Sequence, residues 1–347
     1  MKFYGSRLNM NNLIIGRTRH IAKGFTLVEL MISLSIGLVL FAGVMSVFVG
    51  MRSTTAETSS YGELQENGRF AISVLTDDLF RQNFWGDLSG TFSQNSLIAI
   101  PAAPTDDCVG DGVNNATFPQ AIGPFRTLWG KTIVAGALKP LSCLTMATNT
   151  RIMVGSDVIQ LKRVISNPVA ATSAENYYLS ANLATGGVFA HGAAVPAIDN
   201  SRLWQYQHHV YYVREEAVGN EYIPVLMQGR LANFSMDFSP IIDGIERIRF
   251  MYGVDTDIDP TLPGYGIVDA FISAKNMTQA LWDNAGGSRV LAVKVFVLAR
   301  GIRPDNKYTN NNSYQLGDDL PFTPNDNYRR LLFSSTVTLY NNSVGSW

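Results

Sequence analysis

Residues 24–30 read Gly-Phe-Thr-Leu-Val-Glu-Leu, and an uncharged apolar run continues from Leu30 to Met51. That run is about as long as the ~20 residues that an α-helix needs to cross the hydrocarbon core of a bilayer. The sequence therefore predicts a single membrane-spanning helix over residues 25–51, close to the start of the chain.

Glu29 is the only charged residue of segment 25–51. An isolated carboxylate inside a membrane costs ~2.5 kcal/mol or more and usually marks a functional site, so we expect a cationic partner for it. A cut before Phe25 would create an α-amino group within the membrane, whereas the uncut chain offers Lys23 on the water side. The alternative is an ordinary signal anchor in which Glu29 simply faces the interface.

The segment resembles the class III signal of type IV pilins and type II secretion pseudopilins, because Gly24, Phe25 and Glu29 hold the relative positions of that signal. In that family, a prepilin peptidase cuts after the glycine, and the new N-terminal phenylalanine is N-methylated. The resemblance implies a cleaved leader peptide over residues 1–24, cleavage between Gly24 and Phe25, and N-methylation of Phe25. It also implies that Glu29 sets the register of assembly by neutralising the N-terminal amine of a neighbouring subunit.

The charge distribution predicts the orientation of the chain. Residues 1–24 carry five basic residues and no acidic one, and without them the chain has 22 basic against 28 acidic residues. Because short flanks rich in Lys and Arg stay in the cytoplasm, we expect an inner-membrane anchor with everything after Arg52 in the periplasm. A conventional signal cut after Ala56 is the alternative, but the apolar run exceeds the ~7–15 residues of such a signal.

Helical periodicity continues beyond the membrane, and strands follow it. Apolar residues recur at three- and four-residue steps from Tyr61 to Leu79, which predicts an amphipathic helix over residues 52–86. Apolar residues make up 46% of the chain and charged residues 16%, which favours a large folded core over disorder. The predicted strands are runs of β-branched and aromatic residues, at 157–164, 177–179, 204–213, 223–227, 245–252, 290–299 and 331–340. This order predicts an α+β fold in which an antiparallel sheet packs on the long helix.

Residues 87–150 show the least regular pattern and contain both cysteines, Cys108 and Cys143. We expect loops with one or two short strands in this segment. In an oxidising compartment the two cysteines most simply form one disulfide, and the alternative is two buried free thiols. Neither cysteine has the spacing of a zinc site or of a redox pair.

Later segments resemble the PilW type of minor pilin. They are Leu64-Gln65-Glu66-Asn67-Gly68-Arg69-Phe70-Ala71, the stretch from Tyr252 to Asp257, and the terminal strand that leads to Tyr340. The resemblance implies a pilin-like fold with a periplasmic β-rich body over residues 87–347. It also implies a role in a tip or priming complex, with other minor pilins, the major pilin, the prepilin peptidase and the inner-membrane assembly platform as partners. The alternatives are a minor pseudopilin of type II secretion and a tip module for adhesion or DNA uptake.

The sequence offers little other chemistry. Asp255, Asp257, Asp259 and Asp269 are candidate calcium ligands, but Pro260 and Gly266 break the EF-hand pattern, and a polar turn is the alternative. We expect no other cofactor and no enzyme, because no known catalytic motif appears. We also expect no nucleic-acid partner, because the basic residues are scattered and the body is mildly acidic.

Overall fold

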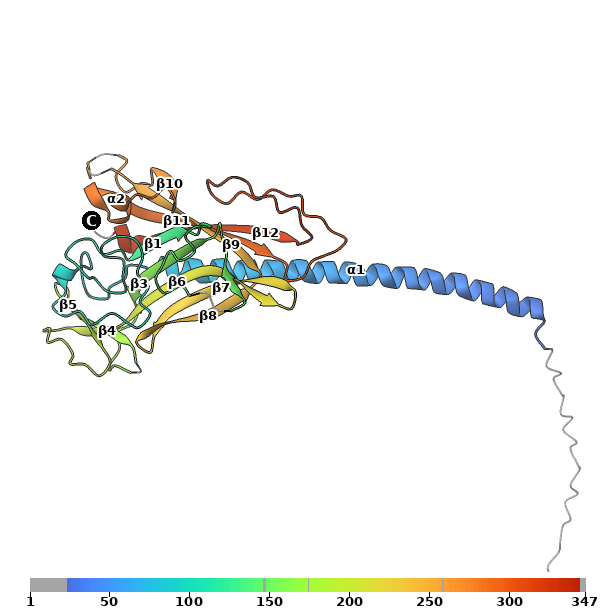
Figure 1. Ribbon diagram of the computed structural model, residues 1–347, viewed down its shortest axis with the longest axis horizontal. Coiled ribbons are helices and arrows are strands. Elements are labelled where there is room, and N and C mark those ends of the chain that lie inside the picture. Colours follow the sequence, from blue (N-terminus) through green and yellow to red (C-terminus); the bar gives the residue numbers. More distant parts are fainter. Residues whose placement is uncertain (1–23, 146–147, 174, 258, 262, 344–347) are drawn as a thin grey trace, which may run out of the picture. The chain divides into compact units, whose positions relative to one another are not determined.

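The computed structural model describes residues 24–145, 148–173, 175–257, 259–261 and 263–343. The leader residues 1–23 lie outside this part. The chain forms two compact units, Met1–Thr58 and Ser59–Trp347. One long helix, α1 (Leu27–Phe80), contributes its first half to one unit and its second half to the other (Figure 1).

In the first unit, the apolar part of α1 has no protein partner among the described residues. The large apolar side chains from Leu27 to Met51 are all exposed, and the most apolar 18-residue window of α1 has a mean hydropathy of 2.4. By length and composition, this is the single helix of the described chain that is able to cross a membrane. This part of α1 has the length and composition that the predicted membrane helix requires.

In the second unit, α1 buries one stripe of its surface. Leu64, Ala71, Leu75 and Leu79 are each at most 2% exposed, which agrees with the three- and four-residue spacing in the sequence. The helix ends at Phe80, whereas the sequence predicts an end near residue 86. Residues 81–83 form a turn in which Asn83 adopts a left-handed conformation (φ 57°), and this turn stops the helix.

The larger of two antiparallel sheets has eight strands. Its main order is β1-β3-β6-β4-β5, and the long strand β6 also pairs with β2 and β7, while β8 pairs with β7. The strands are β1 (Leu128–Thr132), β2 (Thr150–Ile152), β3 (Asp157–Val164), β4 (Tyr177–Ala181), β5 (Gly186–Ala190), β6 (Arg202–Val218), β7 (Glu221–Ala232) and β8 (Ser235–Asp243).

The smaller sheet has the order β10-β9-β11-β12, and all its pairs are antiparallel. It contains β9 (Ile245–Asp255), β10 (Ala270–Ser273), β11 (Arg289–Arg300) and β12 (Arg330–Thr338). Short helices are η1 (Gln94–Ser96), α2 (Gln279–Trp282), η2 (Ala285–Gly287) and α3 (Tyr340–Ser343). A long helix followed by antiparallel sheets confirms the predicted α+β, pilin-like class.

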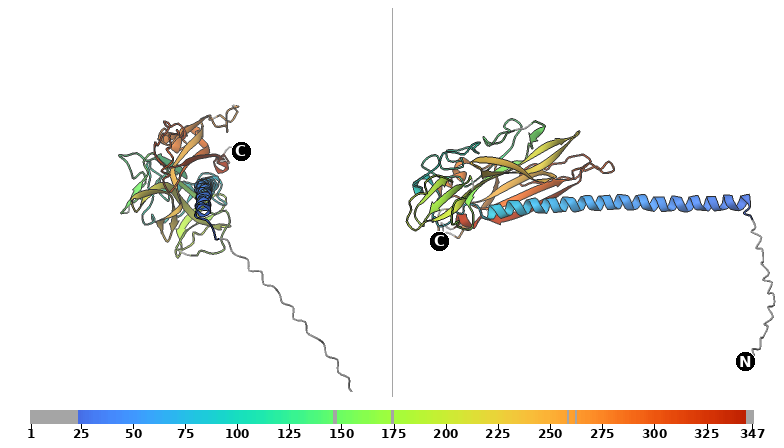
Figure 2. Two further views of the ribbon diagram at one scale, coloured as in Figure 1. Left: turned by 90° about the vertical axis from the view of Figure 1, so that its right-hand side faces the viewer. Right: turned by 90° about the horizontal axis from the view of Figure 1, so that it is seen from below.

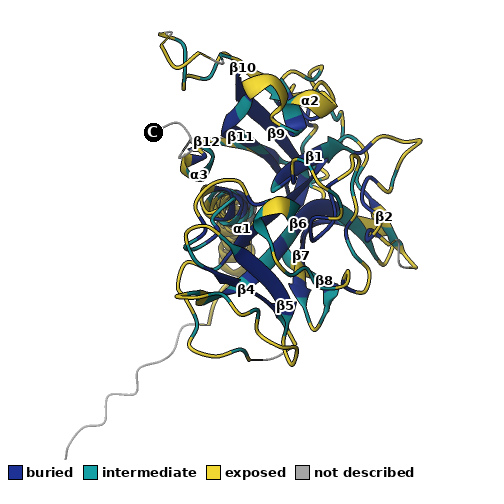
Figure 3. Cartoon of the chain, turned by 90° about the vertical axis from the view of Figure 1, so that its left-hand side faces the viewer, coloured by how far each residue is buried: buried dark blue, intermediate teal, exposed yellow. Residues whose placement is uncertain are grey.

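Within the second unit, helix α1 lies between elements of both sheets. Figure 3 looks along the helix and shows β12 and α3 on one side of it and β4 and β6 on the other. Figures 1 and 2 show β12, in red, beside the second half of α1, where the Phe333 ring packs against Gly68. The smaller sheet therefore reaches the helix through the edge strand β12.

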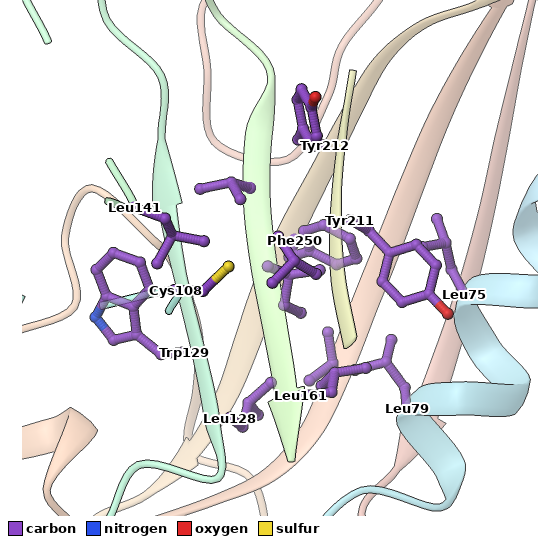
Figure 4. Packing of buried hydrophobic residues seen from close by; sticks show 14 of the residues in the cluster. Leu75, Leu79, Cys108, Leu128, Trp129, Leu141, Leu161, Tyr211, Tyr212 and Phe250 are labelled. Carbon is purple, nitrogen blue, oxygen red and sulfur yellow. The ribbon is translucent and has the colours of Figure 1, made fainter. Parts of the chain in front are cut away.

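Strand β3 is covered on both faces, because all eight of its residues are buried. One face packs on α1, and the other packs on residues 105–127, which we call the 105–127 loop. Figure 4 shows Leu75 and Leu79 of the helix on one side of this strand and Trp129 and Leu141 on the other. A strand that is buried on both faces usually has a continuous apolar sequence. Strand β3 instead carries four charged or amide side chains. These buried polar groups require hydrogen-bond or ionic partners.

Candidate functional site

The N-terminal candidate site begins directly before α1. Gly24, Phe25 and Thr26 are not helical, and the helix starts at Leu27. The Thr26 hydroxyl accepts a hydrogen bond from the backbone N–H of Glu29 (3.2 Å), and the Glu29 carboxylate accepts one from the backbone N–H of Thr26 (3.3 Å). This reciprocal pair is a capping box, which satisfies two helix-end donors and fixes where the helix begins.

The capping box gives Glu29 a local partner that the sequence analysis did not assign. The sequence does contain the pattern of a capping box, which is Thr-x-x-Glu before an apolar run. The cap places Phe25 immediately outside the helix with 84% of its surface exposed, so the Gly24–Phe25 peptide bond is not shielded by helical structure. The predicted cleavage position therefore lies in exposed, non-helical backbone, four residues before Glu29.

Comparisons with known protein families agree with this site and with the second unit. A model described as the prokaryotic N-terminal methylation motif matches residues 19–45, and a model described as Type IV Pilus-assembly protein W matches residues 210–341. Together these two matches support a type IV pilus minor pilin of the PilW family. The chain is a minor pilin that takes part in type IV pilus assembly. Comparisons with curated proteins and with solved structures give no match.

The two matched regions of this minor pilin correspond to different parts of the fold. The first contains the capped start of α1 and most of its apolar segment, and the second runs from within β6 through β12 to α3. The second therefore includes the whole smaller sheet. PilW proteins are structural components of pilus assembly, and the class III signal associates this chain with a membrane and with the pilus.

A buried polar cluster joins α1 to the larger sheet. The carboxylate of Asp78, which is 4% exposed, accepts hydrogen bonds from Arg163 Nε (2.8 Å) and the Tyr211 hydroxyl (2.8 Å) and lies 2.6 Å from His209 Nδ1. Burial acts to raise the pKa of Asp78, but attraction and hydrogen bonding from His209, with further contributions from Arg163 and Tyr211, lower it well below the usual range. Asp78 is therefore an ionised anchor between the helix and strands β3 and β6.

The predicted disulfide between Cys108 and Cys143 is present, and it closes a loop whose ends are 35 residues apart in sequence. Both cysteines are buried in the main core. The bond therefore ties the 105–127 loop to the segment that follows β1. Closing a loop of this length contributes about 3 to 4 kcal/mol of stability in the chain-entropy account.

The candidate calcium ligands are brought together only in part. Asp255, Asp257 and Asp269 have carboxylate oxygens within 4.8 Å of one another, whereas the Asp259 carboxylate accepts hydrogen bonds from Thr261. Calcium takes six to eight oxygen ligands, and one oxygen of Asp255 already accepts a hydrogen bond from the Arg289 guanidinium (2.6 Å). The donor chemistry of this cluster fits calcium incompletely, and the proposed function does not use it.

Several of the basic residues that are scattered along the sequence are buried in ion pairs. Arg163 pairs with Asp78, Arg249 with Asp157 and Arg330 with Glu246. Their guanidinium groups hold elements of the body together, because each pair joins two different strands or a strand and the helix. These three charges are therefore directed into the protein rather than toward a ligand in solution.

Proposed function

We propose that this minor pilin acts in a complex that primes pilus assembly and lies at the tip. In this proposal, the prepilin peptidase cuts after Gly24, Phe25 is N-methylated, and the apolar half of α1 leaves the lipid to pack among the helices of other pilins. The partners are other minor pilins, the major pilin and the inner-membrane assembly platform. The second unit contains two sheets and is larger than a repeating shaft subunit needs to be. This size favours a low-copy position at one end of the pilus.

One observation carries this proposal. The only charge of the apolar segment, Glu29, sits in the first turn of a helix whose apolar surface has no partner among the described residues. The α-amino group of a processed Phe25 from a neighbouring subunit is a cation that can reach such a carboxylate when the helices pack side by side. Removing one partner from a buried ion pair costs about 3 to 5 kcal/mol, so the pair penalises wrong axial register.

The basic leader supports the orientation part of the proposal, in which the second unit faces the periplasm. Protease added to intact spheroplasts tests it. We expect digestion of the second unit in spheroplasts without lysis, and protection of the same unit before lysis would contradict a periplasmic location.

The charge of Glu29 is separable from its capping role by two substitutions. Glu29→Gln removes the charge but keeps the capping box, because Gln serves in the same position. We expect this variant to remain in the membrane and to be depleted from sheared pili at least ~10-fold. The reason is that the buried amine of the neighbouring subunit loses its counter-charge, which makes incorporation less favourable by several kcal/mol.

Thr26→Ala is the matched control, because it removes the cap at a cost of only about 1 kcal/mol and leaves the carboxylate in place. We expect this variant to be incorporated at a level close to wild type. Immunoblots of sheared pili and of membranes, measured side by side, give the incorporated amount and the membrane-bound amount of each variant. Normal incorporation of Glu29→Gln together with loss of Thr26→Ala would assign Glu29 to helix capping alone and overturn the proposed ion pair.

A further inference from the structure

A buried polar cluster between strand β3 and the 105–127 loop has no part in the proposed function. Its central residue is Lys162, which is fully buried and whose Nζ donates a hydrogen bond to the carbonyl oxygen of Arg126 (2.8 Å). The Nζ also lies 3.5 Å from Asn115 Oδ1 and 4.7 Å from the centre of the Phe125 ring. No ion pair formed by the described residues includes this amine. The cluster therefore holds a fully buried lysine against the side-chain amide of Asn115.

Burial lowers the pKa of Lys162 to about 7, with a further lowering by the charge of Arg126 and an opposing effect of Asp107. A large fraction of the amines is therefore uncharged near neutral pH. An uncharged, desolvated lysine amine is a nucleophile, whereas the ammonium form of an ordinary surface lysine is not.

The neighbouring amide is held in one orientation. Asn115 Nδ2 donates a hydrogen bond to the carbonyl oxygen of Asp111 (2.8 Å), while Asn115 Oδ1 accepts one from Gln160 Nε2. The reverse orientation would place two carbonyl oxygens against each other. The carbonyl of Asn115 is thus directed at Gln160 and Lys162, and the Gln160 N–H is positioned to stabilise negative charge that develops on Oδ1.

A chain of hydrogen-bonding groups supports Gln160 from behind. His208 Nε2 lies 3.0 Å from Gln160 Oε1, and His208 Nδ1 lies 2.9 Å from the Thr117 hydroxyl, which is 2.5 Å from Asp107 Oδ1. Gln160, Thr117 and His208 are completely buried. The Asp111 carbonyl holds Asn115 Nδ2, so Gln160 presents an N–H group to Asn115 Oδ1.

We propose that Lys162 and Asn115 form an intramolecular isopeptide bond. The lone pair of Lys162 Nζ attacks Cγ of Asn115, and the electrons of the C=O bond move to Oδ1 beside Gln160. A proton passes from Nζ to Nδ2, the carbonyl reforms, the Cγ–Nδ2 bond breaks, and ammonia leaves. One amide replaces another, so the step needs neither an oxidant nor a co-reactant.

Such a bond gives the 105–127 loop a second covalent tie. The Cys108–Cys143 disulfide holds one end of this loop, and the Lys162–Asn115 bond would fix its middle to a central strand of the larger sheet. Unlike a disulfide, this tie does not depend on the redox state of the compartment. The inference is independent of the proposed function, because it concerns only the second unit.

Peptide mass spectrometry of the full-length protein, purified in detergent from its native membrane, tests the bond directly. After reduction of the disulfide, trypsin does not cut after an acylated lysine, so the expected product joins residues 82–126 to residues 152–163 and is lighter than their sum by one ammonia. Recovery of only the linear peptides 82–126 and 152–162 from folded wild-type protein would overturn the proposal. The wild-type measurement decides the question whether or not any variant folds.

Two variants assign the product to these residues. Lys162→Met removes the nucleophile while keeping an unbranched side chain, and we expect complete loss of the branched peptide. Lys131→Met is the matched control, because Lys131 is a partly exposed lysine of the neighbouring strand β1 that pairs with Asp111, and we expect the branched peptide to persist. Loss of the branched peptide in the control, or its persistence in Lys162→Met, would refute the assigned residues.

Discussion

Asp77 and Asp78 are adjacent residues with the same chemistry and opposite surroundings. The Asp77 side chain is 57% exposed and pairs with Arg81 on the same helix, whereas the Asp78 side chain is 6% exposed and binds Arg163 and His209 from two strands. The difference follows from helix geometry, since Asp78 lies three residues after the buried Leu75 and therefore on the same face. A carboxylate on that face was visible in the sequence, but its partners were not.

We expect Asp78→Asn to lower the free energy of unfolding by about 3 to 5 kcal/mol, because it leaves the buried Arg163 without its counter-charge. The matched control, Asp77→Asn, is expected to change it by less than about 0.5 kcal/mol, as for other exposed pairs. Urea unfolding of the detergent-solubilised full chain, followed by circular dichroism, measures both. Equal effects of the two substitutions would contradict the anchoring role of Asp78.

The same pair of variants gives a pH dependence with a definite sign. Because the folded-state pKa of Asp78 lies below the usual aspartate value of 3.8, its contribution to stability is fully present above pH 3.8. That contribution is lost progressively as the pH falls from there through the lowered folded-state pKa. We therefore expect the stability difference between wild type and Asp78→Asn to shrink as the pH is lowered from about 5 toward 2. A constant difference across this range would show that Asp78 acts through packing instead of charge.

At the scale of elements, the second half of α1 depends on a close approach between the helix and strand β12. A Cβ atom added at Gly68 would lie 2.0 Å from the Phe333 ring, whereas one added at Gly62 would meet no atom within 4 Å. Gly68 is therefore required by packing. Gly62 has no such requirement and only lowers the helix propensity.

We expect Gly62→Ala to raise the free energy of unfolding by about 0.5 to 1 kcal/mol, because Ala favours the helix. Gly68→Ala is expected to lower it by about 1 kcal/mol or more, because overpacking outweighs the same gain in propensity. Truncating the ring in Gly68→Ala/Phe333→Leu is expected to recover part of the loss. Thermal unfolding of the three variants compares them, and stabilisation by Gly68→Ala would contradict the observed packing.

Elements with strong periodicity were predictable, and weakly patterned ones were not. The strand predicted at residues 157–164 coincides with β3, and those at 245–252 and 290–299 lie within β9 and β11. By contrast, β5 begins with Gly186-Gly187 and β2 has three residues, so neither carries a local signal. Such strands are defined by pairing with distant segments, which a local pattern does not encode.

At the scale of the whole molecule, short motifs could be read from the sequence, whereas the internal network of polar contacts could not. Gly24, Phe25 and Glu29 lie within a stretch of six residues, so a short sequence motif is enough to relate them. The partners of Lys162 lie 36 to 47 residues away, and Arg163 and His209 are 85 and 131 residues from Asp78. Contacts of that range depend on how the helix, β3 and the 105–127 loop are layered, which the sequence alone did not specify.

The central claim is that the chain is processed to begin at Phe25, so that Glu29 meets a new amine during assembly. The most direct measurement is mass spectrometry of the N-terminal tryptic peptide from pilus-associated protein. The account predicts a peptide of residues 25–52 that starts with N-methylated Phe25. A mature protein that begins at Glu57, or one that still carries Lys23 and the rest of the basic leader, would contradict the account.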